Sequence, residues 1–104
     1  MNETRFKRLV EDLGEYEGLE EVFLLDPHGK ILLKSKEFPL SEPEAKELLF
    51  SWKDKKGSII FQGNRFAILK NDELQLAAKN IAAGKGNIVG SKTPEGDYVV
   101  AHIS

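Results

Sequence analysis

The sequence predicts an α+β fold, in which an antiparallel sheet of about six to seven strands carries two helices packed on it. Two segments place apolar side chains at helical spacing, whereas the other apolar runs are short and are separated by turn sequences. The connections are short, which favours antiparallel pairing of consecutive strands. The length of 104 residues suits one domain, which we expect to span residues 1–104.

The two helices are predicted from their apolar spacing and from the residues at their ends. The first spans residues 3–13, and its apolar stripe consists of Phe6, Leu9, Val10 and Leu13. The second begins after Ser41, a capping residue, and Glu44 is placed to complete a capping box. It ends near residues 53–56, where lysines suit the negative end of the helix dipole. Its stripe consists of Ala45, Leu48, Leu49 and Trp52.

The remaining apolar runs are predicted to be strands. Residues 20–26 and 30–35 form a hairpin around Asp26-Pro27-His28-Gly29, a sequence typical of a type I turn. After the second helix, strands are predicted at residues 58–62, 65–70, 73–79, 88–92 and 98–103. The segment 73–79 is rich in alanine, so a helix is the alternative there. We predict a mobile loop at residues 84–87.

Two helices are too few to cover both faces of such a sheet, so some apolar sheet surface is left for a partner. In the last strand, Tyr98, Val100 and His102 share one face, while Val99, Ala101 and Ile103 share the other. The first set carries polar tips and tolerates exposure better. We therefore predict that this set lies on the thinly covered side, with Tyr98 and His102 partly exposed in a monomer.

Composition excludes several functional classes. The net charge of −2 and a pI near 5.7 argue against a nucleic-acid-binding protein. The absence of cysteine excludes disulfides, thiolate catalysis and thiolate metal sites. The longest apolar run is four residues, from Val22 to Leu25, which is too short to cross a bilayer. The first thirteen residues lack a signal-peptide core, so we expect a cytoplasmic protein.

The sequence offers no catalytic or metal-binding constellation, and we expect no enzyme activity and no cofactor. His28 falls in a turn and His102 near the end of the last strand, and two histidines are too few for a conventional site. The Gly-Lys-Gly-Asn run at 84–87 lacks the ending of a phosphate-binding loop.

The charge is distributed unevenly along the chain. Residues 1–56 carry ten Lys or Arg and thirteen Asp or Glu, whereas residues 57–104 carry five and four. The basic residues of the second half are Arg65, Lys70, Lys79, Lys85 and Lys92. A local basic face that meets an acidic protein is consistent with this bias.

Three segments give the chain a resemblance to the profilins, small cytoplasmic proteins that bind monomeric actin. The first is DPHGKILLKSKEFP at 26–39, similar to the family's strand, turn, strand and Phe-Pro preceding an acidic helix. The second is FQGNRFAIL at 61–69, similar to the family's Gly-Gly hairpin. The third is GKGNIVGSKT at 84–93, similar to its Gly-rich loop, strand and Lys-Thr turn. The strand at 98–103 follows in the same order.

The resemblance implies an actin-monomer-binding regulator of filament dynamics. The family's basic actin contacts correspond here to Arg65, Lys70, Lys79 and Lys85. The family's polyproline site corresponds to Phe6, Leu9 and Leu32, where aliphatic side chains replace two of the stacking rings. We therefore predict poor binding of proline-rich ligands. Profilins also end in a helix after the last strand that is absent from these 104 residues, so the chain looks like a reduced, archaeal-type profilin.

Two other protein classes stay open. A roadblock- or longin-like scaffold, which dimerises through its sheet or supports a small GTPase, also begins helix–strand–strand–helix. A small-molecule sensor of related topology is the third. The Phe38-Pro39 pair and the segment 84–93 favour the profilin interpretation.

Overall fold

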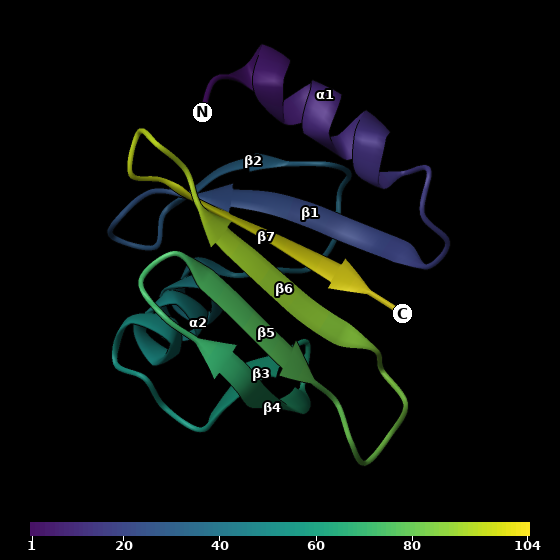
Figure 1. The fold of residues 1–104 in the computed structure, drawn as a ribbon, viewed down its shortest axis with the longest axis vertical. Helices are drawn as coiled ribbons and strands as arrows, with labels where there is room; N and C mark the ends of the chain where they lie inside the picture. The colour runs from purple at the N-terminus through teal and green to yellow at the C-terminus, as the bar shows by residue number, and fades with distance from the viewer.

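The computed structural model describes residues 1–104 and has two helices and one seven-stranded antiparallel sheet, as predicted (Figure 1). The helices are α1 (Glu3–Leu13) and α2 (Glu42–Lys53). The strands are β1 (Leu19–Leu25), β2 (Ile31–Lys34), β3 (Ser58–Phe61), β4 (Asn64–Asn71), β5 (Gln75–Lys79), β6 (Asn87–Lys92) and β7 (Tyr98–Ile103). The alanine-rich segment is therefore a strand. Neither helix has the length and apolar character that crossing a membrane requires.

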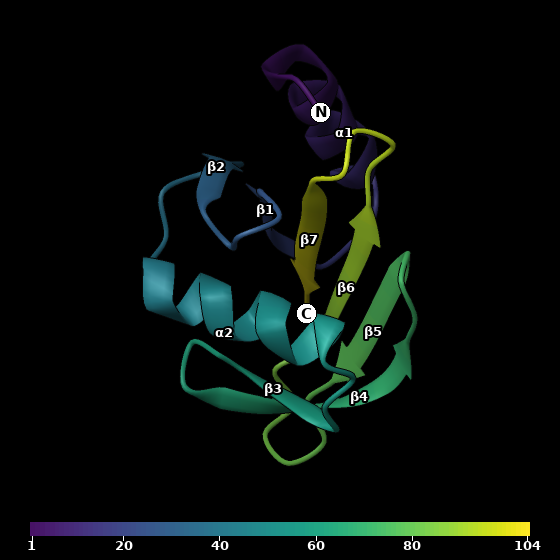
Figure 2. The same ribbon diagram turned by 90° about the vertical axis from the view of Figure 1, so that its left-hand side faces the viewer.

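The strand order is β2-β1-β7-β6-β5-β4-β3, so the last strand lies between the first strand and β6. Figure 2 shows the sheet curling around α2, with α1 on the opposite, outer side. Alternation along the strands matches these two sides: Phe23 and Val100 pack in the cluster under α2, whereas Val22 and Ala101 pack in the cluster under α1.

The core under α2 is large and aromatic. Phe61 is stacked on Phe23 at a centroid distance of 5.9 Å and meets Phe66 edge-on at 6.3 Å. Trp52 meets Tyr98 edge-on at 5.1 Å. Of the nine aromatic residues, only Tyr16 and Phe50 are exposed, so the other seven are buried in the core. The cluster under α1 has four buried members: Phe6, Val22, Leu24 and Ala101.

The starts of both helices are capped by polar side chains. The Asn2 side chain accepts from the Arg5 amide at 2.8 Å, and Ser41 Oγ accepts from the Glu44 amide at 3.2 Å. The predicted capping box is wrong in its second half. The Glu44 carboxylate accepts from the Gln62 amide at 2.7 Å, so it ties α2 to the β3–β4 turn.

The prediction for the two faces of the last strand is also wrong, although His102 is partly exposed as predicted. Tyr98 and Val100 lie in the core under α2, 6% and 0% exposed, and the His102 side chain is 13% exposed. The more open face carries Val99 and Ile103. Polar side-chain atoms did not predict the exposed face, because the inner side of the sheet supplies hydrogen-bond partners for them. One of these partners is Glu21, beside His102.

Two turns are closed by aspartates whose side chains accept backbone N–H groups. Asp26 accepts from the Lys30 amide at 2.9 Å, and this bond is the main cause that holds the pKa of its carboxyl below the usual range. Asp72 accepts from the amides of Leu74 and Gln75, both at 2.8 Å, which lower its pKa in the same way. Both turns therefore favour the charged carboxylate.

These aspartates predict a stability that depends on acid pH. A lowered folded-state pKa gives stability that is present above the unfolded-state value and is lost as pH falls through the folded value. We expect the double variant Asp26→Asn, Asp72→Asn to lose less of its stability than the natural chain between about pH 6 and about pH 3. Urea midpoints measured across that range test this, and parallel curves for the two proteins would contradict it.

Candidate functional site

The outer side of the sheet is left without a helix over β3 to β6. Strand register places Arg65 opposite Ile60, Lys79 opposite Ala67, and Val89 opposite Ala77 on this side. Lys70 also pairs with Ala77, after a bulge in β4. We call this surface the open sheet face: Ile60, Arg65, Ala67, Lys70, Ala77, Lys79 and Val89. It confirms the expectation of sheet surface without cover.

The predicted basic residues lie on or beside this face. Arg65, Lys70 and Lys79 are exposed on its strands, and Lys85 is exposed on the β5–β6 loop. None of the four makes an ion pair within the chain. Arg65 and Lys79 share one end, because the Asn80 side chain, next to Lys79, donates to the Arg65 carbonyl at 2.8 Å. Lys70 lies further along β4. The charges are thus available to an acidic partner.

The loop at residues 80–86 (called loop 80–86 from here) is held by more bonds than the prediction of a mobile loop implies. The Asn80 side chain is buried and accepts from the amides of Ala83 at 2.9 Å and Lys85 at 3.1 Å. The Asn80 amide donates to the Gly86 carbonyl at 2.9 Å. Gly86 has a φ of +85°, and a Cβ there would lie 2.0 Å from the Ile103 carbonyl oxygen.

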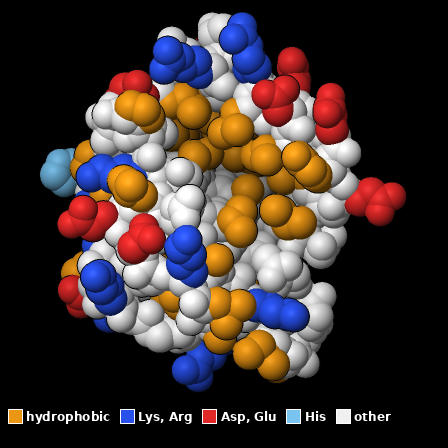
Figure 3. All heavy atoms as spheres, viewed as in Figure 1, with side chains coloured by type: hydrophobic (Ala, Val, Ile, Leu, Met, Phe, Trp, Pro, Cys, Tyr) orange, Lys and Arg blue, Asp and Glu red, His pale blue; other side chains and the backbone are white.

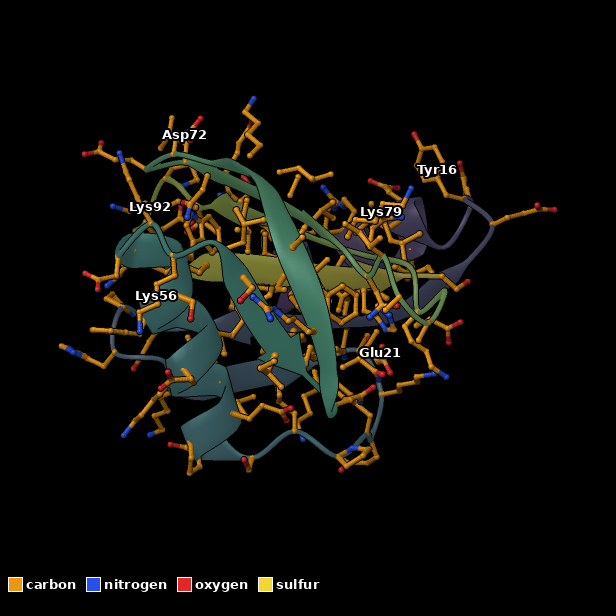
Figure 4. All side chains as sticks on the ribbon, turned by 90° about the horizontal axis from the view of Figure 1, so that it is seen from below. Tyr16, Glu21, Lys56, Asp72, Lys79 and Lys92 are labelled. Carbon is orange, nitrogen blue, oxygen red and sulfur yellow. The ribbon has the colours of Figure 1, made fainter.

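Glu21 and His102 fasten the same loop from the sheet. His102 Nδ1 lies 2.8 Å from Glu21 Oε2, and Nε2 lies 2.7 Å from the Lys85 carbonyl oxygen. Figure 4 shows Glu21 and Lys79 at the end of the sheet opposite Asp72 and Lys92. The sequence prediction treated His102 as an unremarkable strand-end residue and did not consider Glu21. A signal was present, since alternation puts Glu21 on the same inward face as Phe23.

An apolar groove lies between α1 and β6. Its lining residues come from the helix and two strands: Leu9, Leu13, Val89, Gly90, Ser91, Val99 and Ala101. Its volume is about 230 Å³, and Figure 3 shows hydrophobic side chains gathered there, where α1 lies beside β6 and β7. This groove continues the open sheet face through Val89.

The three residues of the expected proline site do not come together. Phe6 belongs to α1 and is buried against the sheet at 3% exposure. Leu9 lines the groove toward β6, and Leu32 is exposed on β2. Leu33, and not Leu32, lies beside Phe6 in a hollow on the other side of α1. A bulge between β1 and β2 explains the slip of one residue, because Leu24 pairs with Leu33 while Leu25 pairs with Ile31.

A second group of lysines lies at the far end of the sheet, around Tyr98. The Nζ atoms of Lys53 and Lys92 lie 5.2 and 5.7 Å from the centroid of its ring. Asp72 and Glu73 line the same hollow of about 280 Å³. Carboxylates are therefore mixed with lysines here, unlike on the open sheet face. The structure contains no group of three or more His, Asp or Glu side chains arranged to hold a metal ion.

Comparison with known proteins gives a consistent result. No family model matches the sequence. The chain is 62% identical over 102 residues to Loki profilin-3 of Lokiarchaeum sp. (strain GC14_75), covering 98% of this chain and 83% of that protein. Among solved structures, LokiProfilin2 in complex with rabbit actin superposes with a TM-score of 0.79 at 19% identity, covering 100% of this chain and 83% of that one. Profilin IA of Acanthamoeba castellanii superposes with a TM-score of 0.74 at 14% identity, covering 95% and 80%.

Proposed function

Because the chain belongs to the profilin family, we propose that it binds monomeric actin and thereby regulates actin filament dynamics, without catalytic activity of its own. Membership rests on the 62% identity to Loki profilin-3 over nearly the whole chain. Solved relatives with this fold include LokiProfilin1 and LokiProfilin2, each in complex with rabbit actin. The roadblock- or longin-like scaffold is set aside on the same ground. The proposal includes a monomeric protein located in the cytoplasm.

The open sheet face is the observation that carries this proposal. It combines an apolar centre, Ala77 and Val89, with cations at its border, Arg65 and Lys79. Protein interfaces commonly have this composition, with an apolar core inside a polar rim. Actin is an acidic protein, so unpaired cations at the border would steer its approach and fix its orientation.

The remaining predicted cations extend the proposed contact. Lys85 is held at the edge of the face by loop 80–86, and Lys70 stands at the far end of β4. We expect their individual contributions to be smaller than that of Arg65 and Lys79, since charges at the outer rim are solvated and are worth about 0.2–1 kcal/mol each.

The direct test is a polymerisation assay with actin from the same source and with rabbit actin. We expect excess protein to slow spontaneous assembly and to keep actin in the supernatant after centrifugation. Analytical ultracentrifugation should show an equimolar complex with monomeric actin. If neither actin forms a complex at concentrations of about 100 µM, which correspond to about 5.5 kcal/mol of binding free energy, the proposal is wrong.

We predict that proline-rich peptides bind poorly, because Phe6 is buried and Leu9 and Leu32 lie apart. A proline helix needs exposed, parallel rings to stack on. Titration of the nitrogen-15-labelled protein with an oligoproline of about ten residues should give no saturable shifts. Saturation at low micromolar peptide would refute the prediction.

A further inference from the structure

Both ring nitrogens of His102 face hydrogen-bond acceptors. Nδ1 lies 2.8 Å from a carboxylate oxygen of Glu21, and Nε2 lies 2.7 Å from the carbonyl oxygen of Lys85. A neutral imidazole carries one N–H and donates once, whereas the doubly protonated ring donates twice. A neutral ring at these distances would turn a nitrogen lone pair toward one of the two oxygens. The geometry therefore fits the charged ring.

Among the groups that hydrogen-bond to the His102 ring or stack against it, the charged one is Glu21. His102 and Glu21 are cross-strand partners in β7 and β1, and their side chains are 13% and 10% exposed. The other faces of the ring meet uncharged groups. Phe61 and Phe66 pack edge-on at centroid distances of 5.2 and 5.9 Å, and Ile88 is the partner on β6. Loop 80–86 contributes a backbone carbonyl.

We propose that His102 is a positioning residue for the interaction surface. In its doubly protonated form it links Glu21 to loop 80–86 and holds Lys85 at the border of the open sheet face. Loss of the ring proton removes one of the two hydrogen bonds and sets a lone pair against an acceptor, which loosens the loop although its Asn80 hydrogen bonds remain. Partner binding then depends on pH through this ring, a step that rests on the proposed function.

The protonation state of the ring can be measured directly. Nitrogen-15 NMR of the imidazole groups at about neutral pH should show two protonated nitrogens for His102. His28, exposed in the turn between β1 and β2, gives the second imidazole signal in the spectrum. A neutral-ring pattern for His102 at this pH would overturn the proposal.

The variant Glu21→Gln separates charge from packing. Glutamine has nearly the same shape and still accepts from Nδ1–H, but it removes the carboxylate that stabilises the charged ring. We expect hydrogen exchange of the Lys85 and Ala83 amides to be about 3- to 10-fold faster than in the natural chain at about pH 8, and equal to it at about pH 6. Faster exchange at both pH values would indicate simple packing damage and would count against the proposal.

Two controls complete the design. His28→Gln removes the exposed histidine and should leave loop exchange unchanged at every pH. Thermal unfolding of Glu21→Gln establishes that the variant is folded, and if it is not, the nitrogen-15 measurement on the natural chain decides.

Actin binding provides the functional arm. The affinity of Glu21→Gln relative to the natural chain should fall about 3- to 10-fold at about pH 8 and recover at about pH 6. If the natural chain does not bind actin, the proposed function fails while the ring and exchange measurements still test the positioning role. If it binds and the ratio does not change with pH, the link from His102 to partner binding is wrong.

Discussion

Replacing Arg65 and Lys79 with glutamate should weaken binding to monomeric actin by about 10- to 100-fold. Both side chains are exposed at the same end of the open sheet face, and neither makes an ion pair in the chain. The double reversal puts negative charge against an acidic partner, which costs more than the loss of two attractive contacts. Titration calorimetry or fluorescence anisotropy with labelled actin measures the change. The unfolding temperature should stay the same, since no intramolecular bond of either side chain is lost.

A matched control uses two lysines away from the open sheet face. Lys36 and Lys46 are also exposed and lie before and within α2, so their reversal gives the same net charge with no change on the proposed surface. We expect this control to lose less than about threefold in affinity. The difference between the two double variants should shrink as salt rises above about 0.1 M, where the Debye length is about 10 Å. Equal losses in both variants would place the contact elsewhere.

The helices and strands could be predicted because their signals are local. The apolar stripe from Phe6 to Leu13 gave the bounds of α1, and the alternation in residues 98–103 gave β7. The position of β7 between β1 and β6 could not be obtained in the same way. Its pairing with β1 joins segments that are about 80 residues apart in the sequence. Neither segment carries a local sequence signal that identifies the strand with which it pairs.

The predicted side-chain directions were wrong where a β-bulge shifted the strand register or where a polar side chain had a buried hydrogen-bond partner. A bulge at Leu24–Leu25 turns Leu33 toward α1 in place of Leu32, so an alignment of residues along the strand misses by one. His102 was expected at a thinly covered surface because histidine is polar. In the fold its polar atoms are satisfied by Glu21 and by a loop carbonyl, and a satisfied polar side chain can be buried.

The four basic residues of the proposed interface were found from the second half's charge bias and the family resemblance together. Their common surface follows from strand register, which places Arg65 and Lys79 at one end. Asn80 was missed entirely, although its side chain organises loop 80–86 through three hydrogen bonds. A single asparagine before a glycine-rich loop is too common in sequences to indicate that role.

Removing the central ring of the core should produce the largest loss of stability. Phe61 is 1% exposed, and its ring packs against those of Phe23, Phe66 and His102. Phe61→Ala leaves a cavity that the sheet and α2 cannot fill by relaxation, so we expect the free energy of unfolding to fall by about 3–5 kcal/mol. The total free energy of unfolding of a domain is about 5–15 kcal/mol, so the variant should be folded at low temperature and should unfold near physiological temperature.

Phe50→Ala is the control for the same chemical change at the surface. Phe50 lies on α2 with 53% of its area exposed, and the Nζ atom of Lys56 lies 5.0 Å from the centroid of its ring. We expect its removal to cost about 0.5–1 kcal/mol, mostly from that contact. Urea unfolding followed by circular dichroism compares both variants with the natural chain. Because Phe61 supports the His102 ring, Phe61→Ala should also speed amide exchange in loop 80–86, whereas Phe50→Ala should not. A cost for Phe61→Ala below about 1 kcal/mol would mean that the aromatic cluster does not hold the two ends of the sheet together.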